Sequence, residues 1–329
     1  MCRKTELMEK SSLGITLFVI KPKIKVQKVI DVYKRVSDYL KENGIRKTEK
    51  KFKLSSETIY RYKRKHKEKK KKKESFIQPK VLLLDIETSF MNVLVWGLYL
   101  QRISHKNIVN EWFIISWSAK WLCDSKVISD VVTPKEALKR KDKRILKGIW
   151  NLINEADIVV THNGDSFDMR KLNARFILNG FDPPLPYQSI DTLTQSRSKF
   201  AFSSHKQDYI TKLLKLPEKI HTEIELWYNC MAGKKESLDR MVEYNMQDVN
   251  GLEEMYLILR PWMKNHPNLL VYSTTQTEGC PNCASRKIQW GGYYATPAGR
   301  YKAYRCLDCG AIGRDKKNQS KSIGRSIGR

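Results

Sequence analysis

The segment VLLLDIET, residues 81–88, constrains the fold most strongly. An apolar run that includes β-branched residues is typical of a strand buried on both faces at the centre of a sheet. Asp85 and Glu87 stand two residues apart, so their side chains leave the same face of this strand. Two adjacent carboxylates beside a buried run are costly unless they are paired or bind a metal ion. The alternative is that Glu87 and Thr88 simply open a loop.

The segments after residue 88 indicate a mixed sheet. Antiparallel strands are expected over residues 92–100, 109–122 and 126–132, and a further strand over 157–163. Helices are expected over 134–157, where Leu138, Ile145, Ile149, Leu152 and Ile153 share one face, and over 167–181 and 237–259. Strands that first follow one another and then alternate with helices predict an α/β fold with a mixed sheet flanked by helices. The pattern assigns nothing between Asp191 and Leu238.

The net charge of +27 is concentrated at the two ends of the chain. Residues 1–80 carry 26 Lys and Arg against 9 Asp and Glu, and residues 279–329 carry 11 against 2. The balances are +17 and +9, which leaves +1 for residues 81–278. Charge on this scale indicates a polyanionic partner, of which nucleic acid is the commonest. A membrane surface is the alternative, but no apolar run reaches the ~18–20 residues that span a bilayer, and no membrane partner is expected.

Residues 27–66 are predicted to form a small, basic, helical N-terminal module. Asn43-Gly44 ends a first helix, and residues 45–65 then read as a short helix, a turn near Leu54 and a second helix. This pattern resembles the helix-turn-helix of resolvase- and transposase-like proteins, and a plain basic helical hairpin is the alternative. Residues 67–79 are expected to be a Lys-rich linker that also suits contact with phosphates, and residues 1–26 carry no assignment.

Two further acidic motifs lie in the middle of the chain. THNGDSFDMRKL, residues 161–172, places Asp168 at the start of a helix, and Asp165 competes with it for any role. A carboxylate at this position often caps the helix, which contributes roughly 0.5–2 kcal/mol, so capping is the alternative for Asp168. YNMQD places Tyr244 and Asp248 one turn apart on one face of the last long helix, where a plain surface pair is the alternative.

Together, LLDIET, HNGDSFDMRKL and YNMQD resemble the three exonuclease motifs of the DnaQ-like superfamily, in the same order and with similar separations. The YxxxD form of the third motif is similar to that of the DEDDy subgroup, which includes the exonuclease domain of family B DNA polymerases. The resemblance covers roughly residues 80–260. It implies a ribonuclease H-like fold, with a five-stranded mixed sheet flanked by helices, for a domain over residues 80–265. It also implies hydrolysis of phosphodiester bonds in the 3′→5′ direction.

The resemblance further implies a role for each acidic residue. Asp85 would bridge two Mg²⁺ or Mn²⁺ ions, Glu87 and Asp248 would complete one ion site, and Asp168 would hold the second ion. Oxygen ligands favour these hard ions. Two ions ~3.5–4 Å apart stabilise both the attacking and the leaving oxygen of a phosphodiester. Tyr244 would orient the nucleophilic water, because a phenol with a pKa of about 10 is a poor base at neutral pH.

Several neighbours of the acidic motifs are candidate substrate-binding residues. His162, Asn163 and Phe167 would line the substrate pocket, and hydrogen bonding at the end of a strand is the alternative for the first two. Asp191, in SIDTL, would support the metal ligands or cap a helix.

The cysteines indicate a second metal site. Four of the seven cysteines form two C-x-x-C pairs, Cys280 with Cys283 and Cys306 with Cys309. Paired spacing of this kind is typical of a structural Zn²⁺ ion held by four thiolates, and the segment resembles a zinc ribbon. We expect a ribbon over residues 274–314 and a disordered tail over 315–329. The same spacing favours a metal site in a reducing compartment over a disulfide framework, so an intracellular location is expected, cytoplasmic or nuclear in a eukaryotic host.

Aromatic and basic residues alternate between the two cysteine pairs. Arg300 and Tyr301 belong to this set, and such a pattern suits single-stranded nucleic acid, in which rings stack on bases and cations contact phosphates. Packing of the ribbon's own core is the alternative.

The sequence therefore predicts a 3′→5′ exonuclease that acts on DNA, with single-stranded ends as the expected substrate. An RNA-processing exonuclease and a non-catalytic regulator built from a helix-turn-helix and a ribbon are the alternatives. A proofreading subunit would differ only in having a polymerase or another replication or repair protein as its partner.

Overall fold

The structure is a computed structural model that describes residues 23–64, 79–99, 102–217, 220, 222–272, 278–297 and 299–320. Residues 67–78 of the linker expected over 67–79, and residues 321–329 of the expected tail, lie outside the described residues. The chain forms two compact units. One contains the body and the cysteine module, and the other contains the N-terminal helices. Among the described residues no helix is both long enough and apolar enough to cross a bilayer.

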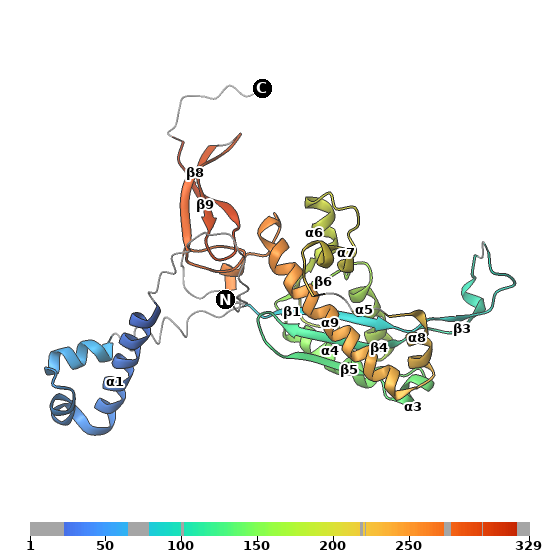
Figure 1. Cartoon of the computed structure of the whole chain (residues 1–329), viewed down its shortest axis with the longest axis horizontal. Helices are drawn as coiled ribbons and strands as arrows, with labels where there is room; N and C mark the ends of the chain where they lie inside the picture. Colours follow the sequence, from blue (N-terminus) through green and yellow to red (C-terminus); the bar gives the residue numbers. More distant parts are fainter. Residues whose placement is uncertain are drawn as a thin grey trace, which may run out of the picture. The chain divides into compact units, whose positions relative to one another are not determined.

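The body is built on a five-stranded sheet (Figure 1). Its elements in chain order are β1 (Val81–Thr88), β2 (Asn92–Val93), η1 (His105–Asn107), β3 (Ile108–Asn110), β4 (Ile114–Trp121), β5 (Val127–Val131), α3 (Pro134–Leu138), α4 (Lys143–Glu155), β6 (Ile158–Thr161), α5 (Asp168–Leu178), β7 (Gln188–Asp191), α6 (Thr192–Lys199), α7 (Gln207–Leu213), α8 (Ile224–Met231), α9 (Lys235–Leu259), η2 (Arg260–Trp262) and η3 (Leu269–Tyr272). The strand order is β5-β4-β1-β6-β7. Strands β5, β4 and β1 pair antiparallel, and β1, β6 and β7 pair parallel. The predicted mixed sheet is confirmed.

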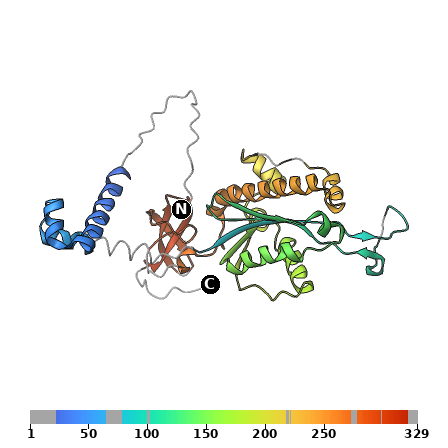
Figure 2. The same ribbon diagram turned by 90° about the horizontal axis from the view of Figure 1, so that it is seen from below.

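Helices cover both faces of the sheet. Figure 2 shows α9 (orange) along one face and α4 (green) on the other. The strand at the centre, β1, is buried along its first four residues because β4 and β6 flank it and helices lie above and below it. Its Leu82 and Leu84 join Ile114 of β4 and Ile149 of α4 in the main apolar core. This burial explains why the strand is apolar on both faces.

The expected strand over residues 92–100 is wrong. Of the described residues 92–99, only Asn92–Val93 is extended, and it pairs with β3 in a separate two-stranded sheet. The reason is that β4 takes the antiparallel place beside β1, with Ile86 opposite Trp117, so the segment finds no free edge there. Its apolar side chains therefore remain exposed, among them Leu94 and Trp96.

The expected single helix over residues 134–157 is also wrong, because it is broken between α3 and α4. Arg140 adopts a left-handed backbone conformation with φ 52°, which a continuing helix does not permit. Its guanidinium donates to the carbonyl oxygens of Phe90 and Glu111. Leu138, which was expected on the buried face, is 66% exposed.

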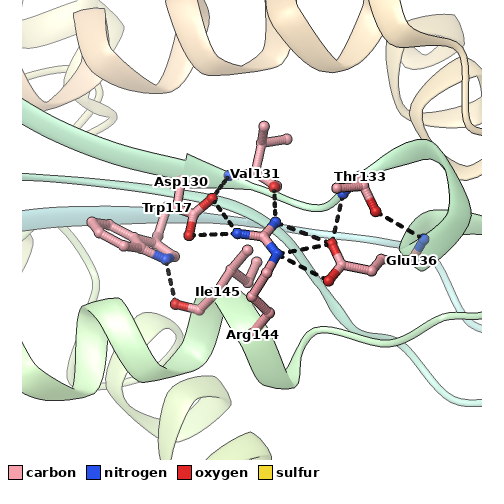
Figure 3. A network of polar contacts seen from close by, with 7 residues as sticks. All are labelled: Trp117, Asp130, Val131, Thr133, Glu136, Arg144 and Ile145. Atoms are coloured by element: carbon pink, nitrogen blue, oxygen red, sulfur yellow. Dashed lines mark hydrogen bonds and ion pairs between the residues drawn. The ribbon is translucent and has the colours of Figure 1, made fainter.

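A network around Arg144 fixes α3 and α4 against β5 (Figure 3). The guanidinium donates to the carboxylates of Asp130 and Glu136 and to the carbonyl oxygen of Val131. Glu136 also closes a capping box with Thr133 at the start of α3. These charge-assisted bonds hold the break in the helix in one geometry.

The N-terminal unit consists of helical segments. Helix α1 (Lys23–Phe52) is interrupted at Gly44, whose φ of 73° and ψ of 174° are not helical. A turn follows, and residues 56–64 are helical again. Val36, Leu40 and Ile59 form a small core between these segments.

The cysteine module is a three-stranded antiparallel sheet in the order β10-β9-β8. Its strands are β8 (Ile288–Thr296), β9 (Gly299–Cys306) and β10 (Ile312–Asn318). Strand β10 continues to Asn318, so it extends past residue 314, the expected end of the ribbon, and Asn318 lies opposite Tyr301 of β9.

Candidate active site

Three carboxylates meet at the end of the central strand. Asp85 and Glu87 lie half-buried on β1, and Asp248 comes from the buried face of α9. Each offers one oxygen atom, and these atoms all lie within 4.8 Å of one another. The alternative, in which Glu87 and Thr88 open a loop, is not what the structure shows, because β1 continues through Thr88. The structure therefore brings together three of the four acidic residues that the sequence singled out.

The position of the cluster follows from the way the sheet opens. Pairing of β1 with β6 ends at Leu83, opposite Val160. Beyond this point β1 and β6 separate, so the backbone of the acidic part of β1 needs another partner on that side. Asp168, at the first turn of α5, fills this place: its Oδ1 accepts the hydrogen bond of the Ile86 N–H at 3.1 Å. Asp168 thus lies against β1 between Asp85 and Glu87.

A tight turn after β6 delivers Asp168 to this position. Asn163 has a positive φ of 69°, and a Cβ added at Gly164 would lie 2.1 Å from Thr161 Oγ1. Only glycine fits such an approach, which explains the HNG sequence between β6 and α5. Phe167 is the N-cap residue of α5, and Asp168 follows it as the first helical residue. The Asp168 carboxylate accepts from the Ile86 N–H on β1 as well as from its own N–H at the start of α5, so helix capping alone does not describe its role.

The surroundings of Asp168 make its carboxyl group harder to ionise. The residue is only 3% exposed. Burial raises the pKa of Asp168 to about 7, and the charge of Asp191 acts in the same direction, while the Ile86 N–H opposes it. Such a carboxylate gains most from a nearby cation. Perturbed acids of this kind concentrate at functional sites.

Asp191 and Asp165 serve the turn and the neighbouring helix. Asp191 caps α6 by accepting from the N–H groups of Leu193 and Thr194, and it also accepts from those of Asn163 and Asp165. Asp165 accepts from the Ser189 hydroxyl at 2.6 Å and is exposed. Of the two alternatives for Asp191, the helix cap is present.

Tyr244 and Asn245 flank the cluster on α9. Tyr244 is 7% exposed, and its ring meets the edge of Trp227 at 6.0 Å between centroids. Asn245 is fully buried and its amide donates to Asp85 Oδ2. Asn245 was not singled out from the sequence, although it stands beside Tyr244 and three residues before Asp248, on the same side of the helix. That spacing is the signal that would have identified it.

The expected substrate-binding residues lie in two places. His162 follows β6, and its Nδ1 lies 2.9 Å from Thr192 Oγ1. The Thr192 hydroxyl donates to the Thr161 carbonyl, so it accepts from the imidazole N–H. Phe167 is 36% exposed beside Asp168. Arg300 and Tyr301 lie on β9 of the ribbon, where the Arg300 guanidinium sits 3.7 Å from the centre of the Tyr293 ring.

The four ribbon cysteines form a second cluster. Their four sulfur atoms all lie within 4.8 Å of one another. The sulfur atoms of Cys280 and Cys309 are 3.6 Å apart and those of Cys283 and Cys306 are 3.5 Å apart, far beyond a disulfide bond of about 2.05 Å. Tetrahedral Zn–S bonds of about 2.3 Å would separate the sulfurs by about 3.8 Å, so the cluster is compatible with a zinc ribbon. A residue with a positive φ follows each cysteine pair, Ala284 after the first and Gly310 after the second. This left-handed backbone conformation lets the chain turn around the sulfur atoms.

Residues 119–260 match the model of the RNase_H superfamily. A solved structure of the family B DNA polymerase from the hyperthermophilic archaeon Pyrobaculum calidifontis is similar over 56% of this chain and 26% of that one, at 15% identity and a TM-score of 0.41. This chain thus matches about a quarter of the length of that polymerase. The comparison with curated proteins found no match. The sheet order and the flanking helices define a ribonuclease H-like fold.

Proposed function

We propose that this protein is a metal-dependent 3′→5′ exonuclease that hydrolyses DNA, with single-stranded ends as its substrate. The observation that carries the proposal is the meeting of Asp85, Glu87 and Asp248 within 4.8 Å at the open end of β1. The ribonuclease H-like fold and the superfamily match support a nuclease activity. The 3′→5′ direction rests on the resemblance of the three motifs, which do not distinguish DNA from RNA. The preference for DNA rests on the resemblance of residues 45–65 to a helix-turn-helix.

The carboxylates fit divalent cations. Three negative charges this close, half-buried or buried, repel one another strongly unless positive charge lies between them. Carboxylate oxygens are hard ligands and suit Mg²⁺ or Mn²⁺. When bound, two such ions stabilise the attacking and leaving oxygens and lower the pKa of the attacking water. Asp85, Glu87 and Asp248 would hold them, and Asp168 would contribute from the start of α5, where its Oδ1 accepts from the Ile86 N–H.

The remaining groups orient the reactants. Tyr244 lies one turn before Asp248, and the edge contact with Trp227 restrains its ring. Its phenol can therefore hold a water molecule by hydrogen bonds without acting as a base. Phe167, exposed beside Asp168, offers a ring on which the terminal base can stack. The Asn245 amide keeps Asp85 in one orientation.

The test uses oligonucleotides of single-stranded DNA, duplex DNA and RNA, labelled at either the 5′ or the 3′ end. With Mg²⁺, 5′-labelled single-stranded DNA should shorten stepwise, 3′-labelled DNA should release a labelled mononucleotide at once, and chelator should stop both. Asp85→Asn and Asp248→Asn should lower the rate about a hundredfold or more. Asp165→Asn, an exposed acid outside the cluster, is the matched control and should retain activity. Undiminished cleavage by Asp85→Asn would rule out the proposed mechanism.

We also propose that the N-terminal unit binds duplex DNA as a helix-turn-helix. The turn before residues 56–64 and the core at Ile59 support this reading, and Tyr60, Arg61 and Lys63 are exposed on the second helix. Replacing Arg61 and Lys63 by Ala should weaken binding and reduce the slope of log affinity against log salt by about two. An unchanged slope would remove this helix from the DNA contact.

A further inference from the structure

An apolar arm continues directly from the strand that carries Asp85 and Glu87. It comprises the described residues 92–99 and 102–110, with β2 and β3 at its base and the tip residues between them. Both views show it projecting beyond the sheet (Figures 1 and 2). At the tip Trp96 is 100% exposed, Leu98 88% and Tyr99 84%. Large apolar side chains gathered on such a projection mark an interaction site, because water solvates them poorly.

The base of the arm is firmly attached to the body. Arg140 donates to the carbonyl oxygens of Phe90 on one side and Glu111 on the other, at 2.6 and 2.8 Å. Ser89 N–H donates to the Phe113 carbonyl, and the Phe113 N–H donates to the Ser89 hydroxyl. These bonds hold the two sides of the arm together immediately after β1 and before β4. The arm is therefore positioned by the strands that form the acidic site.

The charge of the arm points to nucleic acid as its occupant. Residues 89–110 contain Arg102, His105 and Lys106 and neither Asp nor Glu. An apolar protein groove does not require this one-sided charge, whereas a phosphate backbone attracts it. Exposed aromatic rings beside cations form the combination that binds single strands, since every base offers a face on which a ring can stack.

We infer that the arm binds the substrate strand upstream of the acidic site, with Trp96 stacking on a base. The inference rests on the proposed function, because it assigns the arm to the same substrate. The arm lengthens the contact with the strand, so it should matter for a long oligonucleotide and not for a substrate of one nucleotide.

The test compares two substrates on the full chain. One is a 20-nucleotide single-stranded DNA, and the other is the p-nitrophenyl ester of thymidine 5′-monophosphate, which is too short to reach the arm. Trp96→Ala should lower the ratio of kcat/KM for the long strand to that for the ester about tenfold, mainly through KM. Trp96→Phe, which keeps an aromatic ring, should restore most of the ratio. Ile177→Ala, an exposed apolar residue on α5, should leave the ratio unchanged.

A second measurement separates this inference from the proposed function. Binding of the same labelled 20-nucleotide strand is measured by fluorescence anisotropy in an Asp248→Asn background, where hydrolysis is blocked. Weaker binding on adding Trp96→Ala supports the arm even if the wild-type protein cleaves neither substrate. An unchanged ratio and unchanged affinity would overturn the inference. Equal losses of kcat/KM on the long strand and on the ester would also overturn the inference. A Trp96→Ala variant whose only change is from dimer to monomer in sedimentation would overturn it as well.

Discussion

Oδ1 of Asp168 accepts a hydrogen bond from the backbone N–H of Ile86 at 3.1 Å, although 82 residues separate them. This bond attaches the start of α5 to the strand between Asp85 and Glu87. It also satisfies a backbone donor at the point where β6 no longer pairs with β1. One carboxylate thus closes the opening of the sheet beside the acidic cluster.

The Asp168→Asn substitution should separate the role of this side chain in stability, as an acceptor for the Ile86 N–H, from its proposed role as a metal ligand. The amide oxygen can still accept from Ile86, and a buried charge is removed, so the free energy of unfolding should change by less than about 1 kcal/mol. Nuclease activity should fall about a hundredfold because a metal ligand is lost. Asp168→Ala should in addition lose about 1–3 kcal/mol, because the Ile86 N–H is left without its acceptor. Urea unfolding and cleavage rates check both variants; full activity in Asp168→Asn contradicts the metal role.

The Asn245→Ala substitution should remove the hydrogen bond that fixes the orientation of the Asp85 carboxylate. Groups that orient a metal ligand typically account for 10- to 100-fold in metal affinity or activity. We expect a rise of about tenfold in the Mg²⁺ concentration that gives half-maximal rate, with a smaller change at saturating Mg²⁺. A Mg²⁺ titration of the cleavage rate measures this. Equal loss of rate at every Mg²⁺ concentration would mean that Asn245 does not act through the ions.

The ribbon should hold one Zn²⁺ ion that chelators remove slowly. Cys309→Ser should abolish that zinc and unfold the ribbon, because structural zinc supplies much of the folding free energy of such small modules. Cys230→Ser is the control, since this buried thiol belongs to α8 and lies outside the cluster. Metal analysis of the three proteins is the measurement. Equal zinc in wild type and Cys309→Ser would exclude the cysteine site.

Stability should fall in mild acid through His266. Its Nδ1–H donates to the Pro267 carbonyl, so Nε2 must accept from the Tyr256 hydroxyl at 2.7 Å. Burial lowers the pKa of His266 to about 4 from its ordinary 6.5. The folded state therefore binds the proton less readily than the unfolded state, and the stabilisation, complete above pH 6.5, is lost as the pH falls toward 4.

His266→Gln should show the effect of this group. Between pH 7.5 and pH 4.5 the wild type should lose about 2 kcal/mol more than the variant, after allowance for partial exposure to solvent. Urea unfolding at both pH values gives the difference. Parallel losses in the two proteins would show that His266 binds its proton equally well in the folded and unfolded states.

Individual elements were predicted well where a local pattern was strong. VLLLDIET was expected to be a central strand and forms β1, and the expected helices over 167–181 and 237–259 correspond to α5 and α9. The strand expected over residues 92–100 is wrong because an apolar run indicates only that a segment is suited to burial. It does not indicate a place in the sheet, and β4 occupies the place beside β1. The break at Arg140 was missed because its causes, the carbonyls of Phe90 and Glu111, are distant in the sequence.

The sequence by itself determined the features that depend on spacing along one element. Asp85 and Glu87 share a face because strands repeat every two residues, and the C-x-x-C spacing brings two thiols into one turn. Only the tertiary structure decided how Asp168 uses its carboxylate, that Asn245 reaches Asp85 across 160 residues, and that the arm stays uncovered. Spacing reports which side chains leave one element together. Spacing does not report which other element lies opposite those side chains. That depends on how the distant segments of the chain pack around the sheet.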